Sequence, residues 1–193
     1  MTELTRAPRI LVVYGTTDGQ TGKIAAAIGE SLRAAGASAE VANAEGLWNP
    51  APEDFAGVIV AASVHAGGYQ RAVAKWVHAH AGALRQRPTV FVSVCLGVLE
   101  QKPSVNEHLR LIMERFFTQT SWQPTETKIV AGALKYRQYN WLKRWMMKRI
   151  VAKAHGDTDT SRDYEYTDWS DLKTFTERWL ARVRERTTVA IAS

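Results

Sequence analysis

The sequence predicts an α/β fold in which five parallel strands form a doubly wound sheet with helices on both faces. Short, uninterrupted apolar runs such as residues 10–14 and 57–62 are typical of strands that are buried on both sides. Segments with helical periodicity alternate with these runs along the chain. Loops rich in Gly, Ser and Thr follow three of the strands, at the edge where such sheets bind ligands.

The first strand and the first helix form the best defined unit. Residues 10–14 read Ile-Leu-Val-Val-Tyr, and a loop at residues 15–21 separates them from a helical pattern that Gly36 is placed to end. The apolar face of this helix comprises Ile24, Ile28, Leu32 and Ala35. A strand, a tight loop and a helix in this order direct free backbone N–H groups and a positive helix end at one point. Such a point is suited to binding a phosphate.

The remaining elements alternate in the same way. We expect strands at residues 38–43, 57–62, 89–94 and 128–133. We expect helices at about residues 70–80, 103–117 and 168–186. A basic insertion with helical periodicity occupies residues 134–167, between the fifth strand and the last helix. Because no repeat or linker divides the chain, we expect a single domain over residues 1–193.

The composition is that of a soluble globular protein, with 46% hydrophobic and 23% charged residues in a chain of 193. The lone Cys95 excludes an internal disulfide and a cysteine-built metal site, and we interpret it as a small buried side chain rather than a nucleophile. Residues 1–9 have no signal-peptide core, and no stretch approaches a membrane span. The cytoplasm is therefore the expected location.

The positive charge is concentrated in one segment. Residues 127–156 contain eight Lys and Arg residues and no acidic residue, and taking these eight from the net charge of +6 leaves −2 for the rest. This distribution favours a local anionic partner over a surface that coats nucleic acid.

The loop at residues 15–21 matches neither common nucleotide-binding motif. Thr17 occupies the position of the first Gly of a nucleoside-triphosphate loop, and Ile24 occupies that of its magnesium-binding hydroxyl residue. The three spaced glycines of the dinucleotide fingerprint are also missing. The hydroxyl groups of Thr16, Thr17 and Thr21 suit a small terminal phosphate, although an ordinary Thr- and Gly-rich turn has the same composition.

Three loops are expected to leave the carboxyl ends of the strands, at residues 15–21, 63–69 and 93–98. We expect a flat ring between the second and third loops, with its phosphate in the first. Tyr69 or His65 is a candidate to stack on this ring, and a solvated loop histidine is the alternative for His65.

The insertion carries an imperfect amphipathic pattern. Its apolar arc comprises Trp141, Leu142, Trp145, Met146 and Ile150, with Lys143, Arg144 and Lys148 outside the arc. Tryptophans beside basic residues suit a membrane interface, and they also suit a pocket for an aromatic ligand with several carboxylates. A helix packed on the sheet with a solvated basic face is the third interpretation.

These motifs resemble a known family. Thr-Thr-Asp-Gly-Gln-Thr at residues 16–21, together with the loops at Ser63 and Ser93, is similar to the FMN site of flavodoxin-like proteins. The segments 122–124, 129–136, 141–153, 156–160 and 166–169 resemble the bacterial menaquinone-dependent protoporphyrinogen oxidases, also called protoporphyrinogen dehydrogenases (quinone). The resemblance extends from about residue 10 to residue 180. Residues 97–102 depart from it, since an Arg-containing loop is expected there.

The resemblance implies a flavodoxin-like flavoprotein oxidoreductase of haem and porphyrin biosynthesis, with FMN as cofactor. It implies protoporphyrinogen IX as reductant and menaquinone or another quinone as acceptor, and no residue of the chain need be an essential acid or base. The residues expected to bind FMN are Thr16, Thr17, Asp18, Gly19, Gln20, Thr21, Ser63, Val64, His65, Gly67, Tyr69, Ser93, Val94, Cys95, Leu96 and Gly97. The candidates for contact with substrate or membrane are Tyr136, Arg137, Trp141, Lys143, Arg144 and Trp145.

We expect peripheral association with an anionic membrane, on the inner face of the cell membrane, and no nucleic acid or metal. Three alternatives keep the same fold: a flavodoxin-type electron carrier, another FMN quinone reductase, and a scaffold without flavin. Electron carriers of this kind usually present an acidic face, and the basic insertion argues against that function.

Overall fold

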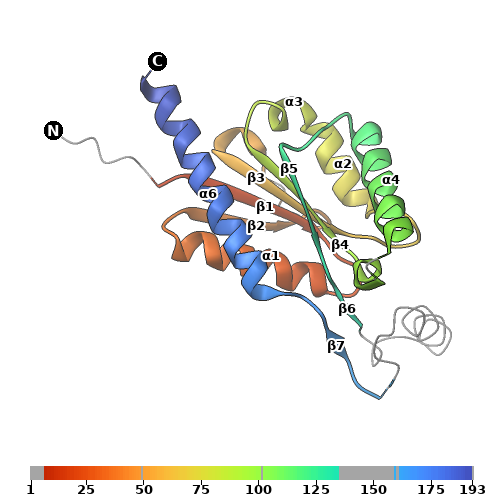
Figure 1. Cartoon of the computed structure of the whole chain (residues 1–193). Coiled ribbons are helices and arrows are strands. Elements are labelled where there is room, and N and C mark those ends of the chain that lie inside the picture. Colours follow the sequence, from red (N-terminus) through yellow and green to blue (C-terminus); the bar gives the residue numbers. More distant parts are fainter. Residues whose placement is uncertain (1–6, 49, 101, 135–158, 160, 193) are drawn as a thin grey trace.

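The computed structural model describes residues 7–48, 50–100, 102–134, 159 and 161–192. Five strands form one parallel sheet in the order β2-β1-β3-β4-β5, with helices on both faces (Figure 1). The strands are β1 (Arg9–Gly15), β2 (Ser38–Asn43), β3 (Gly57–Ser63), β4 (Thr89–Val94) and β5 (Glu126–Val130). The helices are α1 (Gln20–Ala34), α2 (Arg71–Ala79), α3 (Ala81–Leu84), α4 (Pro103–Thr120) and α6 (Trp169–Ala192), with short 3-10 helices η1 (Pro52–Asp54) and η2 (Leu96–Glu100). The predicted fold class is confirmed.

Two apolar layers enclose the sheet, because successive strand residues point to opposite faces. Ile10 and Val12 of β1 pack in the layer that α1 and α6 cover, together with Trp179. Leu11 and Val13 pack in the layer that α2 and α4 cover (Figure 1). β1 is therefore buried on both sides, as its uninterrupted apolar run predicts.

The predicted boundaries of the second and fourth strands agree with the structure, and β1 and β3 are slightly longer than predicted. The helix predicted over residues 70–80 is α2, and the short α3 that follows it was missed. α4 and α6 both continue beyond their predicted ends. The helix predicted within the insertion falls on residues outside those that the structure describes.

The fifth strand is the least accurate prediction, since residues 128–133 do not form one strand. β5 pairs with β4 from Val90↔Glu126 to Val94↔Val130, and β4 ends at that point. Without a neighbour to continue the ladder, the chain leaves the sheet at Ala131. It then forms β6 (Ala133–Leu134), which pairs antiparallel with β7 (Tyr164–Glu165). We refer to β6 and β7 together as the ribbon.

Gly15 ends β1 at a position that has no room for a side chain. A Cβ atom at residue 15 would overlap Val73 Cγ2 and would lie 3.2 Å from Gln70 Cβ. We expect Gly15→Ala to lower the free energy of unfolding by about 1–3 kcal/mol, because α2 must shift to admit the methyl group. Urea unfolding followed by far-ultraviolet circular dichroism measures this change.

Gly82→Ala in α3 is the matched control. A Cβ atom there meets nothing within 4 Å, and a helical position favours Ala over Gly by about 0.5–1 kcal/mol. A Gly15→Ala protein as stable as the wild type would contradict the close packing of β1 against α2.

Candidate functional site

The first two predicted ligand loops leave neighbouring strands at the carboxyl edge of the sheet. Gly15 at the end of β1 is in register with Ala62, and Ser63 at the end of β3 is in register with Val94 at the end of β4. Val64 extends the ladder by donating its N–H to Val94 O at 2.9 Å. The register therefore brings together the three loops at residues 15–21, 63–69 and 93–98.

The first loop turns tightly into α1. Gly19 has φ +84°, and its N–H donates to Thr16 Oγ1 at 2.9 Å. This left-handed conformation suits Gly and places Gly19 at the N-cap of α1. The first N–H groups of an α-helix have no partner within the helix, so the turn presents them together with the positive end of the helix dipole.

A second observation at this turn supports a bound anion. Thr21 is only 1% exposed, and its hydroxyl group has no hydrogen-bond partner among the described residues. An unpaired buried hydroxyl costs free energy, and an acceptor at the helix end would remove that cost. The hydroxyl and backbone N–H groups of this turn are donors that fit a terminal phosphate such as that of FMN.

The first turn of α1 is also tied to β7. Gln20 Nε2 donates to Glu165 Oε1 at 2.6 Å and to Thr167 Oγ1 at 3.1 Å. Lys23 Nζ lies 3.5 Å from Glu165 Oε2, so the basic residue that follows the loop already has an anionic partner. The sequence analysis missed Glu165, because more than 140 residues separate it from Gln20 and no motif connects them.

The second loop contains a tight turn at residues 65–68. His65 and Gly68 exchange backbone hydrogen bonds of 2.8 and 3.1 Å across Ala66 (φ +49°) and Gly67 (φ +76°). His65 and Gly67 are exposed, so the role of His65 as a ring contact or a solvated loop residue stays a prediction.

Tyr69 lies at the end of the second loop and is anchored within it. Its hydroxyl group is 2.8 Å from Ser93 Oγ, and its ring makes edge contacts with Phe91 and Phe116 at centroid distances of 5.0 and 5.1 Å. Burial raises the pKa of the Tyr69 hydroxyl to about 12. Ser93, a predicted site residue, is completely buried, and in the structure its hydroxyl group is hydrogen-bonded to Tyr69.

The third loop begins at Cys95 and continues into η2. Cys95 is half-buried, its Sγ accepts the N–H of Gly97 at 3.2 Å, and burial raises the pKa of its thiol. A protonated, partly buried thiol agrees with the prediction of a small packed side chain rather than a nucleophile.

Gln70 is a second residue that the sequence analysis missed. Its Nε2 donates to Thr17 Oγ1 in the first loop at 3.1 Å and to Ser63 Oγ in the second loop at 2.7 Å. The only signal in the sequence was its position directly after Tyr69 and before α2.

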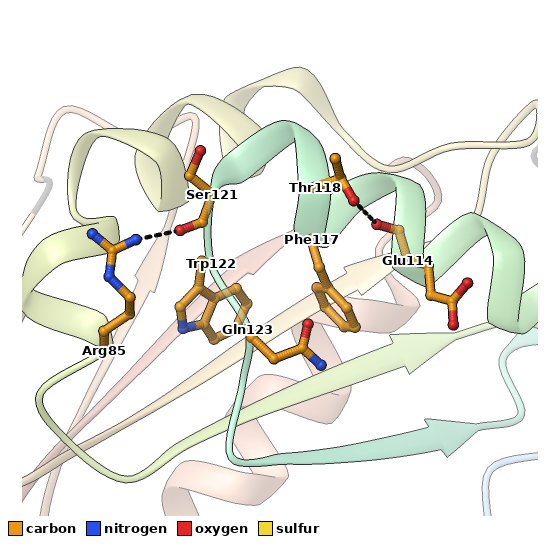
Figure 2. Close-up of a pocket in the computed structure, with 7 residues that line it drawn as sticks. All are labelled: Arg85, Glu114, Phe117, Thr118, Ser121, Trp122 and Gln123. Carbon is orange, nitrogen blue, oxygen red and sulfur yellow. Dashed lines mark hydrogen bonds between the residues drawn. The ribbon is translucent and has the colours of Figure 1, made fainter.

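A different hollow lies at the opposite edge of the sheet. This depression has a volume of about 450 Å³ and lies beside the end of α4. Arg85 donates to Ser121 O there at 2.6 Å, and Figure 2 shows the residues that line it. Arg85 precedes β4 and Ser121 precedes β5, so the depression lies at the amino edge of the sheet. It contains none of the predicted site residues.

The predicted substrate or membrane contacts belong to the insertion. Tyr136, Arg137, Trp141, Lys143, Arg144 and Trp145 all fall outside the described residues. Within the described part of the chain, no group of three or more His, Cys, Asp or Glu side chains suits a metal ion. Among the helices described, none combines the length and the apolar character needed to cross a membrane.

Comparison with known proteins identifies similar chains. The model of the flavodoxin domain family matches residues 11–161. Protoporphyrinogen IX dehydrogenase (quinone) of Escherichia coli K12 is 33% identical over 184 residues, which cover 94% of this chain and 99% of the relative. The Leishmania major protein of the same name is 28% identical over 180 residues, which cover 91% of this chain and 76% of the relative.

Solved structures share the fold at much lower identity. Oxidised flavodoxin 1 of Bacillus cereus is 10% identical with a TM-score of 0.53, and the match covers 90% of this chain and 97% of the flavodoxin. An archaeal flavodoxin is 12% identical with a TM-score of 0.52, covering 91% and 99% of the two chains.

The raised pKa of Tyr69 predicts a specific pH dependence of stability. An unfolded chain ionises Tyr at a pKa near 10, whereas the folded protein retains the Tyr69 proton up to about pH 12. The resulting contribution to stability is complete below pH 10 and is lost as the pH rises towards 12. We therefore expect the stability difference between wild type and Tyr69→Phe to decrease over this pH interval, as measured by urea unfolding at several pH values. A difference that is constant with pH would contradict the buried environment of Tyr69.

Proposed function

This chain belongs to the flavodoxin domain family and, within it, to the protoporphyrinogen IX dehydrogenases (quinone), and we propose that it oxidises protoporphyrinogen IX with FMN as cofactor and a quinone as electron acceptor. The identity of 33% over nearly the whole of both chains is the observation that carries this proposal. The flavodoxin domain supports FMN as the cofactor, and the hydroxyl-rich turn before α1 suits its phosphate.

The residues of the chain have distinct roles in this proposal. Thr16, Thr17 and Thr21 would hold the phosphate together with the first N–H groups of α1. The second and third loops would enclose the isoalloxazine ring. The two ends of the second loop differ in burial, because Tyr69 packs against Phe91 and contacts Ser93, whereas the turn that carries His65 is exposed.

FMN, when bound, supplies the electron and hydride chemistry. The second and third loops of the protein would hold and orient the ring beside the site where the porphyrinogen binds. The Cys95 thiol and the Tyr69 hydroxyl are both protonated at neutral pH, because burial raises the pKa of each group. Neither residue is therefore available as a general base at neutral pH, which fits a reaction that the cofactor carries.

The decisive experiment is anaerobic mixing of the FMN-loaded protein with protoporphyrinogen IX, followed by addition of a quinone. We expect the flavin absorbance near 450 nm to be bleached by the porphyrinogen and restored by the quinone, with protoporphyrin fluorescence appearing in the same time course. A bound flavin that the porphyrinogen does not reduce would instead indicate an electron carrier or another quinone reductase.

Thr21→Val tests the phosphate turn separately. Loss of one hydrogen bond to a charged group costs about 1.5–3 kcal/mol, so we expect FMN to bind about 10- to 150-fold more weakly. Thr174→Val on the exposed surface of α6 is the control and should leave the FMN affinity unchanged. Quenching of flavin fluorescence measures both values, and equal affinities in the two variants would exclude Thr21 as a phosphate ligand.

We also propose that the basic segment at residues 127–156 places the protein on an anionic membrane surface, on the cytoplasmic side. The segment carries eight basic residues and no acidic one, and tryptophans accompany the charges. The candidates for contact with the membrane or with the propionates of the substrate are Tyr136, Arg137, Trp141, Lys143, Arg144 and Trp145. A quinone acceptor dissolved in the bilayer would then be within reach of the same protein.

Binding to vesicles should depend strongly on salt if this electrostatic account is correct. Each basic residue near an anionic surface contributes about 1 kcal/mol to the free energy of binding. At physiological ionic strength, salt screens charges that are more than about 8 Å apart. We expect co-sedimentation with phosphatidylserine vesicles at low salt and its loss at about 0.5 M salt, where the screening is stronger still. Neutral phosphatidylcholine vesicles serve as the control. Binding that is equal at both salt concentrations would contradict the proposed contact.

A further inference from the structure

Gln70 occupies the junction between the first and second loops of the candidate site. It precedes α2 as its N-cap residue, and its side chain extends back across the end of β1. Its Nε2 atom donates to Ser63 Oγ at 2.7 Å and to Thr17 Oγ1 at 3.1 Å. One amide group therefore joins a hydroxyl of the first loop to a hydroxyl at the end of β3.

The packing around Gln70 fixes this arrangement. A Cβ atom built on Gly15 would lie 3.2 Å from Gln70 Cβ and 3.3 Å from Gln70 Oε1, so the absence of a side chain at residue 15 makes room for the glutamine. Substitution of Gln70 removes the only described side-chain bridge between Thr17 and Ser63.

The bridge is maintained at an energetic cost. Gln70 Oε1 is buried and has no hydrogen-bond partner among the described residues. A buried carbonyl oxygen without a hydrogen-bond partner is unfavourable. Rotating the amide by 180° would exchange Oε1 and Nε2, so the amide nitrogen would then lack a partner instead. An apolar side chain of this length would leave no buried polar atom without a partner, but it would not donate to the two hydroxyl groups.

We propose that Gln70 is a positioning residue that couples the phosphate loop to the ring loop, so that binding of a phosphate and binding of an isoalloxazine ring strengthen each other. This inference rests on the proposed FMN site. Thr17 lies in the loop assigned to the phosphate, and Ser63 begins the loop assigned to the ring. A ligand that orders either hydroxyl also orders the amide between them, and the second ligand then binds to a loop that is already in place.

Riboflavin and inorganic phosphate separate the two halves of the cofactor and serve as the probes. The dissociation constant of riboflavin is measured by fluorescence quenching with and without saturating phosphate at constant ionic strength. For the wild type we expect phosphate to tighten riboflavin binding at least about fivefold, the lower end of typical coupling between sites. For Gln70→Met, which keeps the length but not the hydrogen bonds, we expect this ratio to fall to within about twofold of one.

Two further variants make the test specific. Gln86→Met is the same substitution at an exposed glutamine after α3 and should retain the wild-type ratio. Ser63→Ala breaks the other end of the bridge and should lower the ratio as Gln70→Met does, with no additional loss in the double variant. Ser63→Ala also keeps the coupling measurable if Gln70→Met does not fold.

The outcomes distinguish this inference from the proposed function. A wild-type protein that binds FMN but shows no effect of phosphate on riboflavin affinity overturns the coupling and leaves the function intact. If Gln70→Met shows the same ratio of riboflavin dissociation constants without and with phosphate as the wild type, Gln70 has only a packing role, even if the variant binds riboflavin more weakly. A wild-type protein that binds neither FMN nor riboflavin overturns both.

Discussion

The burial of β1 on both faces is the constraint from which the rest of the architecture follows. Residues 10–13 are completely inaccessible to water, with alternate side chains in two separate apolar layers. A strand of this kind needs helices on both sides, and parallel neighbours need crossover connections that supply those helices. All carboxyl ends then lie at one edge. Irregular backbone with exposed polar groups is concentrated there, and so is the candidate site.

The sequence was sufficient to predict those parts of the fold that local patterns determine. The apolar runs located the central strands, and the alternation of runs with helical periodicity predicted the parallel sheet. The fifth strand was misplaced because its end depends on where β4 stops, which is a property of the neighbouring strand. Residues 131–133 are as apolar as β5 itself, so no local pattern marks the point at which the chain leaves the sheet.

The same distinction holds within the candidate site. The composition of residues 16–21 identified the turn, but it did not reveal which hydroxyl groups the protein uses for its own structure. The Thr16 hydroxyl accepts a hydrogen bond from the N–H of Gly19, and the Ser93 hydroxyl is hydrogen-bonded to Tyr69. The buried Thr21 hydroxyl has no hydrogen-bond partner among the described residues. A hydroxyl group can donate or accept with equal ease, so its role depends on three-dimensional neighbours. Glu165 was missed because its partner Gln20 lies far away in the sequence, and Gln70 was missed because no motif connects it to Thr17 and Ser63.

The ribbon of β6 and β7 has a consequence for how this fold can vary. The Tyr166 N–H donates to Gly132 O at 3.1 Å, and Thr167 Oγ1 donates to Ala131 O at 2.8 Å, so the chain leaves and re-enters the domain at one point. The entropy of closing a loop grows only slowly with its length, by about 0.6 kcal/mol for each doubling. Segments of very different length and chemistry can therefore be inserted between β6 and β7 with little loss in the stability of the main sheet. Recognition of a new substrate or surface can evolve there while the cofactor turn stays the same.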